Sequence, residues 1–390
     1  MVTAGGSLPM ALPTPTDTTP GIGDAVDAVE TPAVVVDLDV MERNMDEYAA
    51  VAREHDVALR SHAKTHKIPE IAHRQQRLTD GDGILCQTLS EVEVMAAGGI
   101  DDIYLSYMVV EDRKLDRLCW LAEKLVSFAT TVDGPGNIDP LQAAAARNDV
   151  TVDVVLEIDI GLERVGVAPG SPTVELAQYL VDQPNLRLTG VMAYEGHLAY
   201  SGDANTDAAA FEATCLETMD EVAETVARVE DAGIPVPEVK VGSTATSPYS
   251  AKHDIVDEIN PGMYPFMDAH LVPAAPHIEK ADCALVVEST VISAPTDDRV
   301  IVDAGSKSIA LEVDYPPVDR DDDAVEYYNA SEEHGWVDVG EAEQGFAVGD
   351  RLAFIPPHVC PTINLHDTLV GARDGVVEEV WHVQGRGKVK

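Results

Sequence analysis

A lysine and a turn of small residues are the first groups in this sequence that could do chemistry. Lys64 ends an apolar, strand-like stretch, where a lysine is costly unless its amine has a task such as forming an imine. The run from Gly242 to Thr246 can present backbone N–H groups and hydroxyls to a phosphate. Taken singly, the lysine also fits a surface position and the run an ordinary turn. Together they fit pyridoxal phosphate (PLP), which needs an amine for its aldehyde and a cup for its phosphate.

His358 and Cys360 form a candidate metal site. On a strand, two side chains at this spacing would point to one face. Imidazole and thiolate suit Zn²⁺, and two protein ligands leave open positions for water and substrate. The alternative is a buried cysteine next to a solvent-facing histidine. The five cysteines of the chain are scattered without a C-x-x-C pair, so we expect no disulfide framework and a reducing, cytoplasmic location.

The chain predicts a scaffold that brings strand ends together. Between residues 57 and 260, roughly eight apolar strand-like runs alternate with helical segments, which is typical of a (β/α)8 barrel. A doubly wound open sheet is the rival, but no G-x-G-x-x-G follows the first strand. The expected strands are 57–61, 83–87, 102–106, 128–132, 152–158, 186–193, 237–241 and 256–260. The expected helices are 41–54, 68–76, 90–97, 111–125, 140–147, 173–182 and 207–232.

Composition divides the chain into three parts. Residues 1–30 are rich in Pro, Thr, Gly and Asp and are expected to form a flexible acidic arm. Residues 31–270, which open with an apolar run at 33–36, are assigned to the barrel. Residues 271–390 contain short runs of Val, Ile and Thr and are expected to form a mostly β second domain that carries the metal site. The predicted fold class is therefore α/β, a barrel followed by a β domain.

Several motifs, in this order, together resemble the fold-type III PLP enzymes related to alanine racemase. They are S-H-A-K-T-H-K, C-Q-T-L-S-E, G-L-E-R-V-G-V, A-Y-E-G-H-L, N-P-G-M-Y and D-A-G-S-K. More narrowly, they resemble the branch of D-serine dehydratases and D-threonine aldolases. The later motifs S-E-E-H-G (331–335) and P-H-V-C-P-T-I-N-L (357–365) are similar to the metal-binding domain of that branch. The resemblance runs from about residue 31 to residue 387.

The resemblance implies roles for residues at matching positions. Lys64 would form the imine with the cofactor, Arg164 would lie near its phenolic oxygen and Tyr194 near its pyridine ring. Gln87 would line the cofactor site, and His197 would be a catalytic residue of the active-site loop. The phosphate would be held by Gly242, Ser243, Thr244, Ala245 and Tyr264.

The same resemblance makes His358 and Cys360 the side chains that hold a divalent metal, Zn²⁺ or Mn²⁺, next to the substrate hydroxyl. The aldolases of the branch resemble H-x-D and the dehydratases H-x-C, so Cys360 favours dehydration without deciding it. His334, in the motif S-E-E-H-G, fits either a site residue or a structural one.

The implied function is a PLP- and metal-dependent lyase acting on D-β-hydroxy-α-amino acids. A D-serine dehydratase-like activity, which yields pyruvate and ammonia, is the first expectation. A D-threonine aldolase, which yields glycine and acetaldehyde, is the alternative. A racemase ranks lower because it has no use for the H-x-C pair, and a non-catalytic PLP-binding protein is a remote possibility. The wider family also implies a homodimer with active sites near the interface.

Net charge limits the partners of this protein. The 26 basic and 69 acidic residues give a formal charge of −43, which excludes a nucleic-acid binder with a basic surface and disfavours an anionic membrane as partner. Because 45% of the residues are hydrophobic, we expect a folded core under an acidic surface. Such a surface suits a salt-rich, halophilic cytoplasm, where screening weakens the self-repulsion. No stretch reaches the roughly 18 apolar residues of a membrane span.

Overall fold

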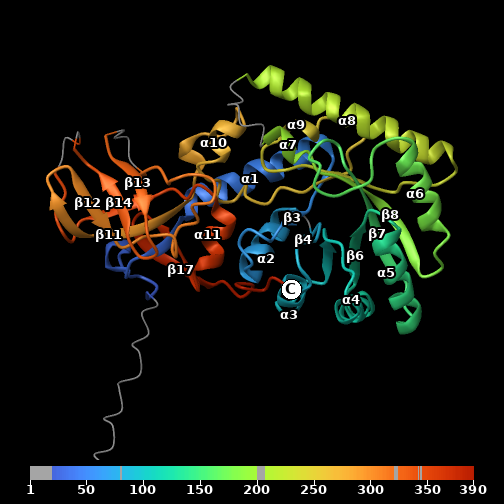
Figure 1. Ribbon diagram of the computed structural model, residues 1–390, viewed down its shortest axis with the longest axis horizontal. Helices are drawn as coiled ribbons and strands as arrows, with labels where there is room; N and C mark the ends of the chain where they lie inside the picture. The colour runs from blue at the N-terminus through green and yellow to red at the C-terminus, as the bar shows by residue number, and fades with distance from the viewer. Residues whose placement is uncertain (1–19, 80, 200–206, 320–323, 341, 343–344) are drawn as a thin grey trace, which may run out of the picture.

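The computed structural model describes residues 20–79, 81–199, 207–319, 324–340, 342 and 345–390 of the chain. Figure 1 shows a barrel surrounded by helices and, next to it, a smaller domain built mostly of strands. Most of the expected arm, residues 1–19, lies outside the described residues. The rest of it is not free, because the N–H groups of Gly23 and Val26 donate to main-chain oxygens of Val377 and Gly375.

Parallel strands form the barrel, in the order β2-β10-β9-β8-β7-β6-β5-β4-β3. Only Arg60 separates β2 from β3, so these two are halves of one strand and the sheet closes on itself with eight strand positions. The predicted (β/α)8 barrel is thereby confirmed. Its strands are β2 (Ala58–Leu59), β3 (Ser61–His62), β4 (Ile84–Cys86), β5 (Asp102–Leu105), β6 (Ser127–Val132), β7 (Val152–Ile158), β8 (Leu186–Ala193), β9 (Val239–Val241) and β10 (Glu258–Ile259).

Helices cover the outside of the barrel and bury their apolar sides against its strands. Some of them begin at a capping side chain: Asp37 caps the first helix and Thr88 caps the helix after β4, each through its side-chain oxygen. The longer helices are α1 (Leu38–His55), α2 (Pro69–Leu78), α3 (Leu89–Ala97), α4 (Asp112–Lys124), α5 (Pro135–Asn148), α6 (Ser171–Val181) and α8 (Ala208–Asp231). Short ones are α7 (Gly196–Ala199), α9 (Ser247–Ser250) and α10 (Leu271–Ala274).

A mixed sheet forms the second domain, in the order β13-β14-β12-β11-β1-β16-β17, with β15 paired to β11. Its strands are β1 (Ala33–Asp37), β11 (Leu285–Thr296), β12 (Arg299–Val302), β13 (Glu326–Ala330), β14 (Gly335–Asp338), β15 (Arg351–Phe354), β16 (Thr368–Arg373) and β17 (Val376–His382). One helix, α11 (Val359–Leu365), faces the barrel. β1 differs from the expectation: the run assigned to the barrel pairs with β11 and β16 of the second domain. Helix α1 then carries the chain into the barrel.

Acidic side chains lie mainly on the surface of the described chain. Among the described residues, five acidic side chains are buried: Glu91, Glu157, Glu195, Glu258 and Asp268. No described helix has the length and apolar composition that a membrane crossing requires.

Salt should therefore control the stability of this protein. The free energy of unfolding is expected to fall steeply from about 1 M KCl to about 0.01 M KCl, because the screening length grows from about 3 Å to about 30 Å and the surface carboxylates repel one another. Thermal unfolding followed by circular dichroism along a KCl series measures this effect. Sucrose, which stabilises without screening, is the control. An equal melting temperature at both salt concentrations would contradict the expectation.

Candidate active site

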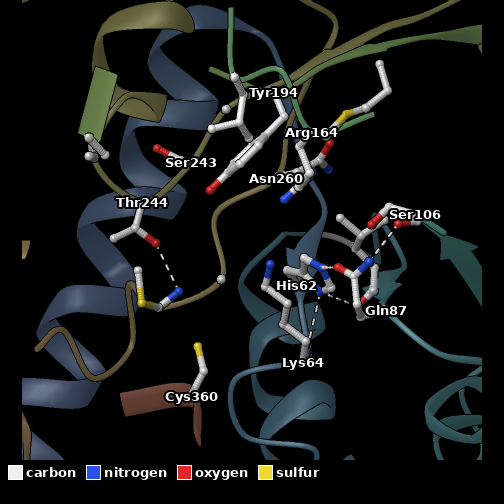
Figure 2. A pocket seen from close by; sticks show the side chains of 18 of the residues that line it. His62, Lys64, Gln87, Ser106, Arg164, Tyr194, Ser243, Thr244, Asn260 and Cys360 are labelled. Carbon is white, nitrogen blue, oxygen red and sulfur yellow. Dashed lines mark hydrogen bonds between the residues drawn. The ribbon is translucent and has the colours of Figure 1, made fainter. Parts of the chain in front are cut away.

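One cavity of about 460 Å³ lies at the carboxyl ends of the barrel strands, next to α11 (Figure 2). The residues predicted from the sequence that line it are Lys64, Gln87, Arg164, Tyr194, Gly242, Ser243, Thr244, Ala245, His358 and Cys360. The lining also contains polar residues that the sequence analysis did not single out, namely His62, Ser106, Glu157 and Asn260. The cavity has the size and the mixed lining of a small-molecule site.

Lys64 lies in the turn that follows β3, and its side chain enters the cavity (Figure 2). Burial lowers the pKa of Lys64 and the charge of Arg164 acts in the same direction, while the charges of Cys360 and Glu91 oppose the shift. A lowered pKa increases the share of the neutral amine, which is the form that attacks an aldehyde. The environment of Lys64 therefore suits imine formation with PLP.

Gln87 is fixed by a chain of polar contacts that begins next to Lys64. Its Oε1 lies 3.2 Å from His62 Nε2, and its Nε2 donates to the main-chain oxygen of Ser106 at 2.9 Å. Burial lowers the pKa of His62 well below its usual value, so this imidazole is neutral. The Lys64 N–H then donates to His62 Nδ1 at 3.3 Å. His62 lies within the S-H-A-K motif, and its inward position could have been read from the alternation along the strand.

The turn after β9 has the features of a phosphate cup. Gly242 adopts φ 98°, a left-handed conformation that favours glycine, and an added Cβ would lie 2.6 Å from Ser247 Oγ. The buried N–H groups of Thr244 and Ala245 donate to no protein acceptor within the described residues. Backbone donors of this kind suit an anion.

Glu195 supports this turn from behind. The carboxylate accepts hydrogen bonds from the Gly242 N–H at 2.8 Å and from Ser250 Oγ at 2.6 Å, and the side chain is fully buried. Burial raises the pKa of Glu195, although these hydrogen bonds oppose the shift. The N–H groups of Gly242 and Ser243 are therefore already used, which leaves those of Thr244 and Ala245 available for an anion.

Arg164 lies over the ring of Tyr194, with its guanidinium carbon 4.9 Å from the ring centre. Its Nη2 lies 3.7 Å from Oε1 of Glu157, which projects from β7 and is buried. Burial raises the pKa of Glu157 to about 7, although the charge of Arg164 opposes the shift. A carboxyl with such a pKa in a cavity is a typical sign of a functional site.

The raised pKa of Glu157 predicts a pH-dependent stability. The folded protein keeps a proton on Glu157 between its ordinary value of 4.5 and about 7, whereas the unfolded chain releases it. The contribution of this group to stability is therefore fully present below that window and is lost as pH rises through it. Glutamine cannot release a proton, so Glu157→Gln should not show this loss. Between pH 5 and pH 8, the free energy of unfolding of the original protein should fall by roughly 3 kcal/mol more than that of the variant. Urea unfolding of the cofactor-free protein at both pH values measures it.

The control for this experiment is Glu163→Gln, which changes an exposed carboxylate of the following loop. It measures what the loss of an exposed carboxylate does to the free energy of unfolding at each pH value. If the effect of Glu157→Gln differs from that of this control at neither pH value, the raised pKa of Glu157 is wrong.

His358 and Cys360 lie at the start of α11, and Cys360 is its second residue. The expectation that they lie on a strand is wrong; the beginning of a helix, rather than the alternation of a strand, turns both toward the cavity. Thr65 Oγ1 lies 3.1 Å from Cys360 Sγ, and Glu312 Oε1 lies 2.8 Å from His358 Nδ1. No group of three or more His, Cys, Asp or Glu side chains suited to a metal occurs among the described residues.

The donor chemistry of the pair fits a divalent metal whose remaining positions are open. The hydrogen bond with Glu312 occupies Nδ1 of His358 and leaves Nε2 for a metal, an arrangement common around metal-bound histidines. Burial acts to lower the pKa of His358, but a hydrogen bond with Cys360 and the charge of Cys360, helped by Asp268 and Glu312, outweigh it and raise the pKa to about 9. A metal would replace the proton that the pair holds.

Three candidates from the sequence do not reach the cavity. Tyr264 is buried next to it, but its hydroxyl lies 2.7 Å from Ser61 Oγ and accepts a hydrogen bond from Gln75, so its expected phosphate contact has no support in the geometry. His197 lies against Gly161 and is absent from the lining. His334 lies in the turn between β13 and β14 in the second domain. The assigned roles of Tyr264 and His197 stay predictions.

A closed (β/α)8 barrel with a lysine at a strand end, a phosphate cup and a second β domain defines the class of PLP enzymes that share the alanine racemase fold. Comparisons with known proteins agree. Residues 36–270 match the family described as "Alanine racemase, N-terminal domain", and residues 284–372 match the "Putative serine dehydratase domain".

D-threonine aldolase of Arthrobacter sp. is 36% identical over 97% of each chain. The crystal structure of D-threonine aldolase from Filomicrobium marinum has a TM-score of 0.88 at 34% identity and covers 95% of this chain and 100% of its own. D-threo-3-hydroxyaspartate dehydratase of Delftia sp. (strain HT23) is 28% identical over 87% of this chain and 93% of its own. This chain belongs to the D-threonine aldolase and D-serine dehydratase family of PLP-dependent lyases.

Proposed function

We propose that this lyase acts on D-β-hydroxy-α-amino acids and uses a divalent metal together with PLP. The observation that carries the proposal is that Lys64 and the pair His358 and Cys360 line one cavity. Lys64 would hold PLP and the pair would hold a metal, so both groups would supply their chemistry within the same cavity. A relative also supports it, since the C353A mutant of D-threo-3-hydroxyaspartate dehydratase has been solved in a metal-free form.

Each of these cavity residues has a separate role in the proposed reaction. Lys64 would hold the aldehyde of the cofactor, and its amine would also move the proton at Cα of the substrate. The N–H groups of Thr244 and Ala245 would hold the phosphate. Arg164, placed between Glu157 and Tyr194, would orient the ring. PLP supplies an electron sink for charge at Cα, and a metal held by His358 and Cys360 would polarise the β-hydroxyl.

Of the two possible cleavages, we propose the aldolase reaction first. D-threonine would lose the Cα–Cβ bond and yield glycine and acetaldehyde. Whole-chain similarity supports this choice, because the aldolases are 33–36% identical over at least 95% of this chain and the dehydratases 26–28% over less of it. The order therefore differs from the one that the H-x-C motif suggested.

Dehydration is the second candidate, and one observation favours it. Two solved structures of D-threo-3-hydroxyaspartate dehydratase carry the replacement of a histidine and of a cysteine two positions further along. His358 and Cys360 have the same types and spacing. On this reading, D-serine would lose its β-hydroxyl and yield pyruvate and ammonia.

Product analysis separates the candidates. The purified protein, with PLP and Zn²⁺ or Mn²⁺ in concentrated KCl, would be incubated with D-threonine, D-serine and their L-forms as controls. Glycine with acetaldehyde from D-threonine would support the aldolase. 2-Oxobutyrate from D-threonine, or pyruvate from D-serine, would support the dehydratase. Turnover of the L-forms alone would overturn the proposal.

Zinc as the resident metal, a homodimer and a cytoplasmic location are further parts of the proposal. Light scattering coupled to gel filtration in concentrated salt tests the dimer. Elemental analysis of the protein as purified tests the metal.

A further inference from the structure

The segment Gln384–Lys390, which follows β17, returns from the second domain to the rim of the barrel (Figure 1). The N–H of Gly385 donates to the main-chain oxygen of Lys67 at 3.0 Å, in the loop that carries Lys64. Two residues later, the N–H of Gly387 donates to Asn364 Oδ1 at 3.0 Å, in α11. The segment therefore contacts both the loop of the imine-forming lysine and the helix of the metal pair.

Its last residues reach a third element of the site. Thr88 Oγ1 donates to the main-chain oxygen of Lys388 at 2.7 Å, and the N–H of Ser90 donates to that of Lys390 at 2.9 Å. Both partners lie at the beginning of α3, directly after Gln87. The segment thus connects the loop that contains Lys64, the helix that contains Cys360 and the start of the helix that directly follows Gln87.

The contact with Lys67 is close. A Cβ added to Gly385 would lie 2.7 Å from the Cβ of Lys67 and 3.1 Å from its main-chain oxygen, so any larger residue must displace the loop. Lys67 itself has φ 58°, an uncommon conformation for a residue with a side chain. An uncommon conformation persists when its surroundings fix it, and the segment is part of those surroundings.

From Lys67 a chain of contacts leads back to the cavity. Lys67 Nζ forms an ion pair with Glu91 Oε1 at 3.0 Å, and both side chains are largely buried, with 11% and 3% exposed. The other carboxylate oxygen, Glu91 Oε2, accepts the N–H of Gln87 at 2.8 Å. Lys67 and Glu91 do not line the cavity, so they act on it only through their neighbours.

We propose that the segment Gln384–Lys390 and the ion pair of Lys67 with Glu91 position Lys64 and Gln87 for cofactor binding. The observation behind the proposal is the continuous path from Gly385 through Lys67 and Glu91 to Gln87. The inference rests on the proposed role of Lys64 as the cofactor lysine. Gly385, Lys67 and Glu91 are positioning residues, whereas Lys64 and Gln87 line the cavity.

The test measures PLP binding, not turnover. Gly385→Ala forces the loop away, and Lys67→Met removes the charge that holds Glu91. Each should weaken PLP binding to the cofactor-free protein by about tenfold or more, since displacements near 1 Å have effects of this size. Each should also shift the pH midpoint of the band of lysine-bound PLP at roughly 410–420 nm, because Lys64 changes its surroundings.

Two matched variants serve as controls. Gly136→Ala places the same methyl group in α5, where it meets nothing within 4 Å, and should leave PLP binding unchanged. Lys67→Arg keeps the charge and should restore most of the affinity that Lys67→Met loses.

The outcomes are distinguishable. If Gly385→Ala and Lys67→Met fold and bind PLP within about twofold of the original protein, with the same pH midpoint, the positioning role is wrong. If Gly385→Ala does not fold, Lys67→Met with its arginine control decides. If the original protein forms no band with PLP, the proposed function fails, and the inference fails with it.

Discussion

Lys64→Ala is expected to lower the turnover of D-threonine by about 10³-fold or more, because in the proposed function one amine both holds the cofactor and moves the proton at Cα. The variant should also lack the band at roughly 410–420 nm after incubation with PLP, since that band requires the lysine. Absorbance of the loaded protein and product formation in concentrated salt measure the two effects. A small primary amine added to the assay should restore part of the turnover.

The matched control is Lys124→Ala, which removes an exposed lysine that pairs with Glu123 at the end of α4. It should keep both the band and the turnover. If Lys64→Ala keeps its fold and still turns over D-threonine at the original rate, Lys64 is not the cofactor lysine.

The barrel could be predicted because its signals are local. Short apolar runs alternate with helical segments, and Lys64 and Gly242–Thr246 stand where strands end. The position of β1 could not be predicted in the same way. An apolar run such as Ala33–Val36 fits a buried strand in either domain, and only its distant partners β11 and β16 decide.

Residues that depend on a neighbour from another element were missed. Glu157 lies within a largely hydrophobic strand, and it forms an ion pair with Arg164 of the following loop. Glu195 matters because it holds the Gly242 N–H across 47 positions of sequence. In neither case does sequence spacing reveal the contact, although a carboxylate within an otherwise apolar strand was a signal that could have been followed.

The prediction for His358 and Cys360 placed the pair on the wrong secondary-structure element. The family resemblance singled out the pair, and both side chains do line the cavity. The predicted strand is instead the first turn of a helix, and that turn contains Pro361. Proline is tolerated in the first turn of a helix, so it was a signal for this structure. Reading that proline would have placed Cys360 in a helical turn.

Removal of the metal is expected to lower turnover by about 10²-fold or more while PLP stays bound, because polarisation of the β-hydroxyl is lost and the phosphate cup is untouched. Dialysis against EDTA, followed by addition of Zn²⁺ or Mn²⁺, measures the loss and the recovery. His358→Ala should show the same loss without recovery. Turnover that is unchanged by EDTA in a protein shown to be free of metal would contradict the metal's role.

Variants near His358 and Cys360 distinguish residues that bind the metal from a residue that only orients a metal ligand. Glu312→Gln keeps both ligands but weakens the hydrogen bond to His358 Nδ1, so metal affinity should fall by about 10- to 100-fold while turnover at saturating metal stays close to the original. Glu333→Gln changes an exposed residue that pairs with Lys307; it is the control and should leave the metal affinity unchanged.

Cys360→Asp replaces a thiolate with a carboxylate and should shift the metal preference from Zn²⁺ toward Mn²⁺, because the softer thiolate favours Zn²⁺. A preference that does not move would mean that the sulfur of Cys360 is not a ligand.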